Sequence, residues 1–61
     1  MQRVLIIEDE MAMRTALQDV LTAEGYRVLS AADGEVGLRR AIDEKPDLIL
    51  LPGVALLDLT P

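Results

Sequence analysis

Apolar residues follow two different spacings along the chain, and each spacing predicts one kind of element. Two short runs, at residues 4–7 and 48–51, are aliphatic throughout, which is typical of strands covered on both faces of a parallel sheet. Between them, apolar residues recur every three or four positions, which is the period of a helix with one buried face. The sequence therefore predicts strands at residues 4–7, 26–31 and 47–51, separated by helices at 11–24 and 34–44.

Local signals mark where the two predicted helices begin and end. Gly25 stands where a glycine commonly ends a helix, and Asp33 is a good N-cap for the second helix, which Lys45-Pro46 stops. Gly37 allows this helix to pack closely, at some cost in helicity. The side chains expected to face the core are Met13, Ala16, Leu17, Val20 and Leu21 in the first helix and Val36, Leu38, Ala41 and Ile42 in the second.

Strands that alternate with helices of this length predict right-handed crossovers and an α/β fold with a parallel sheet. The second strand is short and partly polar, as edge strands often are. A domain of 61 residues buries only about 60% of the surface that its unfolded chain exposes. We therefore expect the chain to need a partner for stability.

Composition narrows the classes of function. Tyr26 is the only aromatic residue although 51% of the chain is apolar, so the core must be aliphatic. The net charge of −5 argues against nucleic-acid binding, and no apolar run approaches the roughly 20 residues that cross a bilayer. The chain has no Cys and no His, which excludes disulfides and imidazole chemistry and fits the cytoplasm. No signal peptide is expected before the first strand.

Glu8, Asp9 and Glu10 are three consecutive acids at the carboxyl end of the first strand. Ligands of open parallel sheets bind at this end of the strands. Two carboxylates there would suit Mg²⁺, which needs only one or two from the protein. Alternatively, Asp9 or Glu10 could accept from the free N–H groups of the first helical turn and interact with the helix dipole.

Four local motifs resemble the receiver domain of response regulators. They are Val4-Leu5-Ile6-Ile7-Glu8-Asp9-Glu10, Tyr26-Arg27-Val28, Ala31-Ala32-Asp33-Gly34-Glu35 and Lys45-Pro46-Asp47-Leu48-Ile49-Leu50-Leu51. The resemblance implies half of a flavodoxin-like doubly wound sheet, with strand order 2-1-3 and one helix on each face. Residues 1–51 would form this receiver-like unit, followed by a divergent apolar segment at 52–61. Glu8 and Asp9 would be the ligands of a weakly bound Mg²⁺, while Glu10 opens the first helix.

The resemblance fails at the residue after Leu51. Receivers carry there the aspartate that takes the phosphoryl group, and this chain has Pro52, which offers no nucleophile and no backbone N–H. In a second interpretation Asp58 is the phosphoacceptor and part of residues 48–55 is an insertion. We favour Pro52 at the acceptor position, which predicts a degenerate receiver-like module of a two-component phosphorelay with no enzyme activity of its own. A histidine kinase is a partner only if phosphotransfer survives.

The alternative function is structural. A sheet cut after its third strand leaves a flat, hydrophobic edge that templates pairing with another chain. The sequence thus predicts a self-associating half-fold, most simply a homodimer whose third strands meet antiparallel about a two-fold axis. The side chains expected at this interface are Leu48, Leu50, Leu51, Val54, Leu56 and Leu57.

Overall fold

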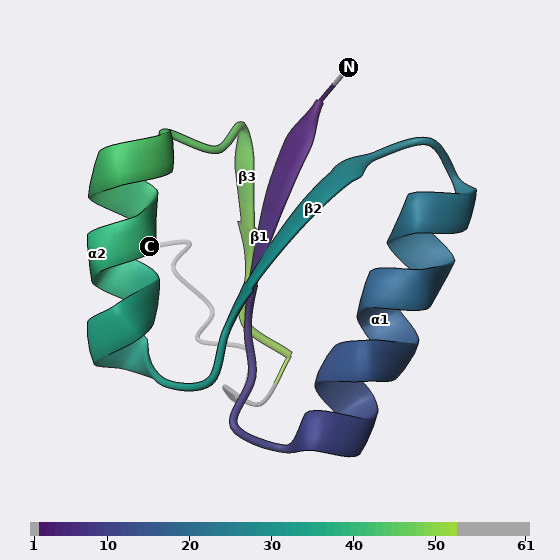
Figure 1. Ribbon diagram of the computed structural model, residues 1–61, viewed down its shortest axis with the longest axis horizontal. Coiled ribbons are helices and arrows are strands. Elements are labelled where there is room, and N and C mark those ends of the chain that lie inside the picture. Colours follow the sequence, from purple (N-terminus) through teal and green to yellow (C-terminus); the bar gives the residue numbers. More distant parts are fainter. Residues whose placement is uncertain (1, 53–61) are drawn as a thin grey trace, which may run out of the picture.

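The computed structural model describes residues 2–52 and has the five elements that the sequence predicts (Figure 1). In chain order these are β1 (Arg3–Ile7), α1 (Met11–Ala23), β2 (Arg27–Ala31), α2 (Gly34–Glu44) and β3 (Leu48–Leu50). The predicted boundaries agree to within one residue at every element end. Val54, Leu56, Leu57 and Asp58 lie outside the described residues, so the expectations placed on them stay predictions.

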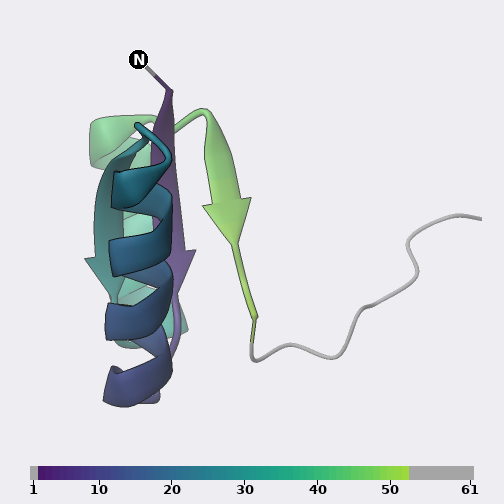
Figure 2. The same ribbon diagram turned by 90° about the vertical axis from the view of Figure 1, so that its right-hand side faces the viewer.

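The three strands form one parallel sheet in the order β2-β1-β3, as expected (Figure 2). β1 pairs with β2 along its whole length, from Arg3 opposite Arg27 to Ile7 opposite Ala31. The pairing with β3 is shorter, and it places Leu5 opposite Ile49. This is half of a flavodoxin-like α/β fold, with β1 at its centre.

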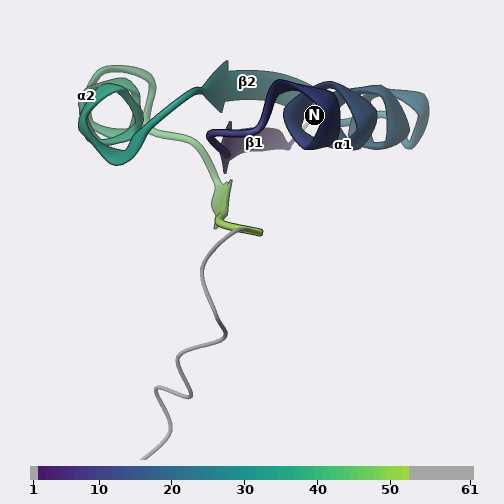
Figure 3. The same cartoon turned by 90° about the horizontal axis from the view of Figure 1, so that it is seen from below.

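The two helices lie on opposite faces of the sheet, level with β1 and β2, while β3 extends beyond them (Figure 3). The buried aliphatic side chains of the described part are Val4, Leu5, Ile6 and Ala31, and the first three are fully buried. They belong to β1 and to the end of β2, where both faces of the sheet are covered. The core is therefore aliphatic, as the sequence predicts, and is centred on β1.

The helices bury less than their periodicity predicts. No residue of α1 is buried, and Gly37 is the only buried residue of α2. Met13 and Val20 are 42% and 58% exposed. The prediction that they face a core is wrong, and it also fails for Val36, Leu38 and Ile42, because each helix packs mainly on β1 and β2.

The ends of the helices follow the signals in the sequence. Gly25 adopts φ = 95°, its N–H donates to the Thr22 carbonyl, and the Tyr26 N–H donates to the Leu21 carbonyl. These bonds form the glycine-terminated C-cap that the sequence predicts. At the start of α2 the Asp33 carboxylate accepts from the Val36 N–H at 2.9 Å, which confirms Asp33 as the N-cap.

Three hydrogen bonds attach the amino end of β3 to β1. Asp47 Oδ2 accepts from the Arg3 N–H at 2.8 Å, and the Asp47 N–H donates to the Arg3 carbonyl at 2.9 Å. The Arg3 guanidinium also donates to the Lys45 carbonyl at 3.0 Å. The chain turns at Lys45, which adopts φ = 49°, and these bonds then hold β3 beside β1.

Candidate functional site

The acidic residues that follow β1 lie at the carboxyl end of the sheet, where ligands of open α/β sheets bind. A depression of about 370 Å³ opens there. Its lining comes from the ends of all three strands and the start of α2, and consists of Ile7, Glu8, Asp9, Ala32, Asp33, Gly34 and Leu51. The structure thus brings Glu8 and Asp9, predicted as metal ligands, into one site, as two consecutive residues of one turn.

Glu8 is held from several directions. Its N–H donates to the Ala31 carbonyl at 3.0 Å, and its own carbonyl accepts from Arg14 Nη1 at 2.8 Å. Its Oε1 accepts from the Glu10 N–H at 3.1 Å. The residue is only 5% exposed, and its second carboxylate oxygen, Oε2, has no hydrogen-bond partner among the described residues.

An unpaired carboxylate oxygen is costly to bury, because burial removes its water without supplying a replacement. A cation in the adjoining depression would supply that replacement. Asp9 is exposed at the edge of the same depression and offers a second carboxylate. The donor set therefore fits a hard divalent cation that keeps most of its water ligands.

The acids do not cap α1 in the way the sequence suggested as the alternative. Glu10 is the N-cap residue by position, but no side-chain cap hydrogen bond is made there. The carboxylate that reaches back to this turn belongs to Glu8, and it satisfies the N–H of Glu10 itself. The capping role proposed for Asp9 or Glu10 is therefore wrong for the described residues.

Sequence reasoning missed Arg14. Its side chain reaches back from the first turn of α1 to the Glu8 carbonyl and is half-buried. The spacing of six residues, with Arg on a helix that follows an acidic turn, was the signal that could have revealed it. Asp33 was predicted only as a cap, and it also lines the depression.

The acidic site is small as a metal site. Within residues 2–52 no group of three or more Asp or Glu side chains is close enough to hold a metal ion. Leu51, the residue after β3, also lines the depression, and Pro52 follows it. The described residues thus offer the carboxylates of Glu8 and Asp9, the carboxylate of Asp33, which already accepts from the Val36 N–H, and aliphatic side chains such as Leu51.

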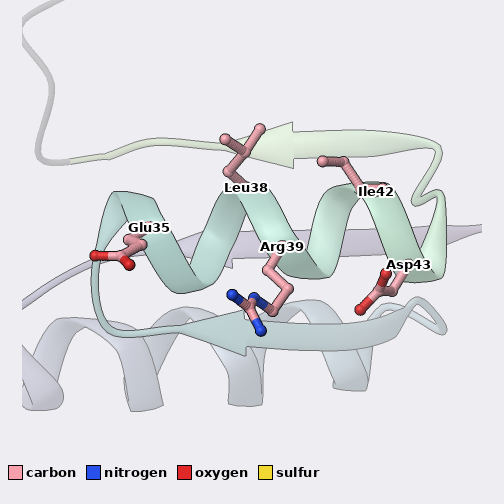
Figure 4. Close-up of a pocket in the computed structure, with 5 residues that line it drawn as sticks. All are labelled: Glu35, Leu38, Arg39, Ile42 and Asp43. Carbon is pink, nitrogen blue, oxygen red and sulfur yellow. The ribbon is translucent and has the colours of Figure 1, made fainter.

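A second hollow, of about 410 Å³, lies on α2 (Figure 4). Arg39 is flanked there, one helical turn away on each side, by Glu35 and Asp43. Leu38 and Ile42 complete the lining, and they point toward β3 rather than to the side of Arg39. This hollow shares no residue with the acidic site.

Neither helix of the described part is long and apolar enough to cross a membrane. Residues 4–54 match the response regulator receiver domain. The chain is 48% identical to the transcriptional regulatory protein AfsQ1 of Streptomyces coelicolor, over 88% of this chain and 26% of AfsQ1. It is 46% identical to the alkaline phosphatase synthesis transcriptional regulatory protein PhoP of Bacillus subtilis, over 82% of this chain and 21% of PhoP.

Sporulation initiation phosphotransferase F of Bacillus subtilis is 38% identical over 82% of this chain and 40% of that protein. The chain thus spans less than half the length of each of these relatives. The matched region contains β1 from Val4 onward and the other four elements, including the acidic turn and β3. The chain therefore belongs to the response regulator receiver domain family.

Proposed function

We propose that the chain is a degenerate receiver-like module of a two-component phosphorelay, one that keeps the acidic site but does not accept a phosphoryl group. The observation that supports this is that the chain leaves β3 beside the acidic depression. Leu51 lines the depression, and the next residue is Pro52, at the position where the family resemblance places the acceptor aspartate. A proline has no nucleophilic side chain, so no phosphoryl group can be bound there.

We expect little catalysis by the chain itself. No Lys lines the depression within residues 2–52, so this part of the chain supplies no ammonium to stabilise the developing charge of a transferred phosphoryl group. We accordingly propose no enzyme activity, and no contact with nucleic acid for a chain with a net charge of −5. The cytoplasm, where histidine kinases deliver phosphoryl groups, is the compartment that this function requires.

Acetyl phosphate should leave the mass of the intact chain unchanged. The physical reason is the loss of the acceptor carboxylate at Pro52. Intact mass spectrometry, with and without the donor, measures this directly. A stoichiometric gain of one phosphoryl group that disappears in Asp58→Asn would refute the proposal and establish Asp58 as the acceptor.

Mg²⁺ is the cofactor that we propose for the acidic site, held weakly by Glu8 and Asp9. Support comes from the buried, unpaired Oε2 of Glu8 and from the exposed carboxylate of Asp9 beside it. In this family a bound Mg²⁺ supplies positive charge for phosphoryl transfer. Here the cation would chiefly neutralise the acidic turn.

Divalent cations should bind with a dissociation constant in the millimolar range or above, and this binding should depend on Asp9. We expect Asp9→Asn to weaken Mn²⁺ or Mg²⁺ binding at least about tenfold, a loss of about 1.4 kcal/mol, because one of two charged ligands is removed. Asp19→Asn is the matched control, since it removes the same charge from an exposed position of α1. Isothermal titration calorimetry of the natural chain, Asp9→Asn and Asp19→Asn measures the three cation affinities. Submillimolar binding that persists in Asp9→Asn would place the cation elsewhere.

Self-association is the second candidate function, and the exposure of β3 favours it. Leu48, Ile49 and Leu51 are 55%, 44% and 45% exposed. The strand carries no charged side chain, although charges are the usual protection of an exposed sheet edge. We propose a homodimer that covers this edge, with Leu48, Leu50 and Leu51 at the interface. In this role the chain would act as an assembling half-fold rather than as a signalling switch.

A further inference from the structure

Arg14 bonds to the acidic turn at two points from the start of α1. Its backbone N–H donates to the Glu10 carbonyl at 3.0 Å, and its Nη1 donates to the Glu8 carbonyl at 2.8 Å. The side chain is half-buried. Arg14 thus connects the helix to both ends of the turn that carries the two proposed metal ligands.

The position of Arg14 is unfavourable for the helix taken alone. Arg14 is the fourth residue of α1, and a positive charge near the amino end of a helix opposes the helix dipole. The first turn of α1 has no acidic residue that could offset this charge. The favourable contact of the guanidinium is instead a charge-assisted hydrogen bond to the acidic turn. We therefore ask what this bond does for the turn.

The bond fixes the peptide that joins the two proposed ligands. The Glu8 carbonyl and the Asp9 N–H belong to one planar unit, so a donor on that carbonyl opposes rotation of the whole unit. On its other side, the Glu8 N–H donates to the Ala31 carbonyl at 3.0 Å, and its Oε1 accepts from the Glu10 N–H at 3.1 Å. Arg14 therefore completes the restraint of Glu8 and sets the direction in which the chain continues to Asp9.

We infer that Arg14 is a positioning residue of the cation site. It contacts no cation itself, and it holds the Glu8–Asp9 peptide so that both carboxylates stay beside the depression. This rests on the Mg²⁺ binding proposed above and adds the residue that orients the two ligands. Groups that orient metal ligands through hydrogen bonds typically change metal affinity by roughly 10- to 100-fold when they are removed.

The charge of Arg14 acts in the opposite direction. A guanidinium near a bound cation repels it, so removal of the charge alone would strengthen Mg²⁺ binding. Loss of the positioning bond would weaken it. A contribution to folding alone would lower the stability of the chain and leave the dissociation constant of its folded form unchanged. The sign of the change in the dissociation constant therefore separates the three roles.

Arg14→Met and Arg14→Lys test the inference in the full chain. Arg14→Met keeps the apolar stem but removes the donor and the charge, and its Mg²⁺ dissociation constant should rise about tenfold. Arg14→Lys keeps a charged donor and should stay within about threefold of the natural chain. Arg40→Met is the matched control, since it removes the same charge from an exposed position of α2 that lines neither hollow. Its dissociation constant should be unchanged or slightly lower.

Amide NMR shifts of Asp9 and Glu10, followed during a Mg²⁺ titration at constant ionic strength, give the dissociation constants. Circular dichroism shows whether each variant is folded. If Arg14→Met does not fold, Arg14→Gln, which shortens the side chain, takes its place with the same expected weakening. A dissociation constant equal to or below that of the natural chain would overturn the positioning role.

The ¹³C shift of the Glu8 carbonyl, measured without Mg²⁺, is a second readout that does not depend on cation binding. It should change in Arg14→Met and stay close to that of the natural chain in Arg14→Lys. If the natural chain binds no Mg²⁺, the proposed cation site is overturned, and this carbonyl shift alone decides the role of Arg14. An unchanged shift in Arg14→Met would then overturn the inference as well, whereas a changed one would support Arg14 as the residue that orients the turn.

Discussion

Leu5→Ala should lower the free energy of unfolding by about 2–5 kcal/mol, which is the usual cost of truncating a large aliphatic side chain in a core. Leu5 is 0% exposed and lies at the centre of the middle strand, between Leu29 and Ile49. Few side chains are fully buried in the described part, so no neighbour can collapse into the cavity without exposing another core residue. The variant should populate unfolded chains at room temperature.

Urea unfolding followed by circular dichroism, at one fixed protein concentration, measures this effect. Met11→Ala is the control, because it truncates a side chain of similar size that is 70% exposed at the start of α1. We expect its effect to stay within about 0.5 kcal/mol. Equal costs for Leu5→Ala and Met11→Ala would mean that β1 is not the centre of the core.

Gly37→Ala should destabilise the fold by up to about 2 kcal/mol even though alanine favours helices. A Cβ atom at Gly37 would lie 2.7 Å from Cγ1 and 3.2 Å from Cγ2 of Ile7, and closer still to Cδ1. Because Cγ1 and Cγ2 both branch from Cβ of Ile7, a rotamer change cannot relieve both contacts, and the side chain of Ile7 or the helix must shift. Such overpacking costs about 1–3 kcal/mol, against roughly 1 kcal/mol gained in helix propensity.

Gly34→Ala provides the matched control in the same helix. A Cβ atom at Gly34 would meet nothing within 4 Å, so the substitution should be neutral or stabilise by up to about 1 kcal/mol. Thermal unfolding of the two variants compares them directly. If Gly37→Ala were as stable as Gly34→Ala, α2 would lie farther from β1 than described.

Local signals predicted the elements, their order and their ends, because each depends on residues close in sequence. Gly25 and Asp33 are examples, since each ends or begins a helix through bonds to residues within four positions. The extent of burial was not predictable in this way. Leu38 and Ile42 have the periodicity of a buried stripe, yet they are 62% and 63% exposed, because periodicity indicates a face but not what covers it.

Only part of the acidic site was predicted, because the sequence reveals local features but not contacts between residues that are distant in sequence. Glu8 and Asp9 stand out as acids after an aliphatic strand, and the structure places them together in one depression. Arg14 escaped notice because its contact is with a backbone carbonyl, so only its position on the helix that follows the acidic turn could have indicated it. The burial of Glu8 was equally hidden, and so was the backbone bond that joins it to Ala31 at the end of a neighbouring strand.

The bonds between Arg3 and Asp47 decide where the chain tolerates a change of length. Asp47 is bound to Arg3 through its side chain and its backbone. The register of β3 against β1 is therefore fixed at Asp47 and not at the end of α2. An extra residue before Asp47 lengthens only the turn at Lys45-Pro46, and the sheet keeps its alignment. An extra residue directly after Asp47 shifts every following side chain of β3 to the opposite face of the sheet. An insertion before Asp47 thus changes only the surface. The same insertion one position later turns the side chains of β3 to the opposite faces of the sheet.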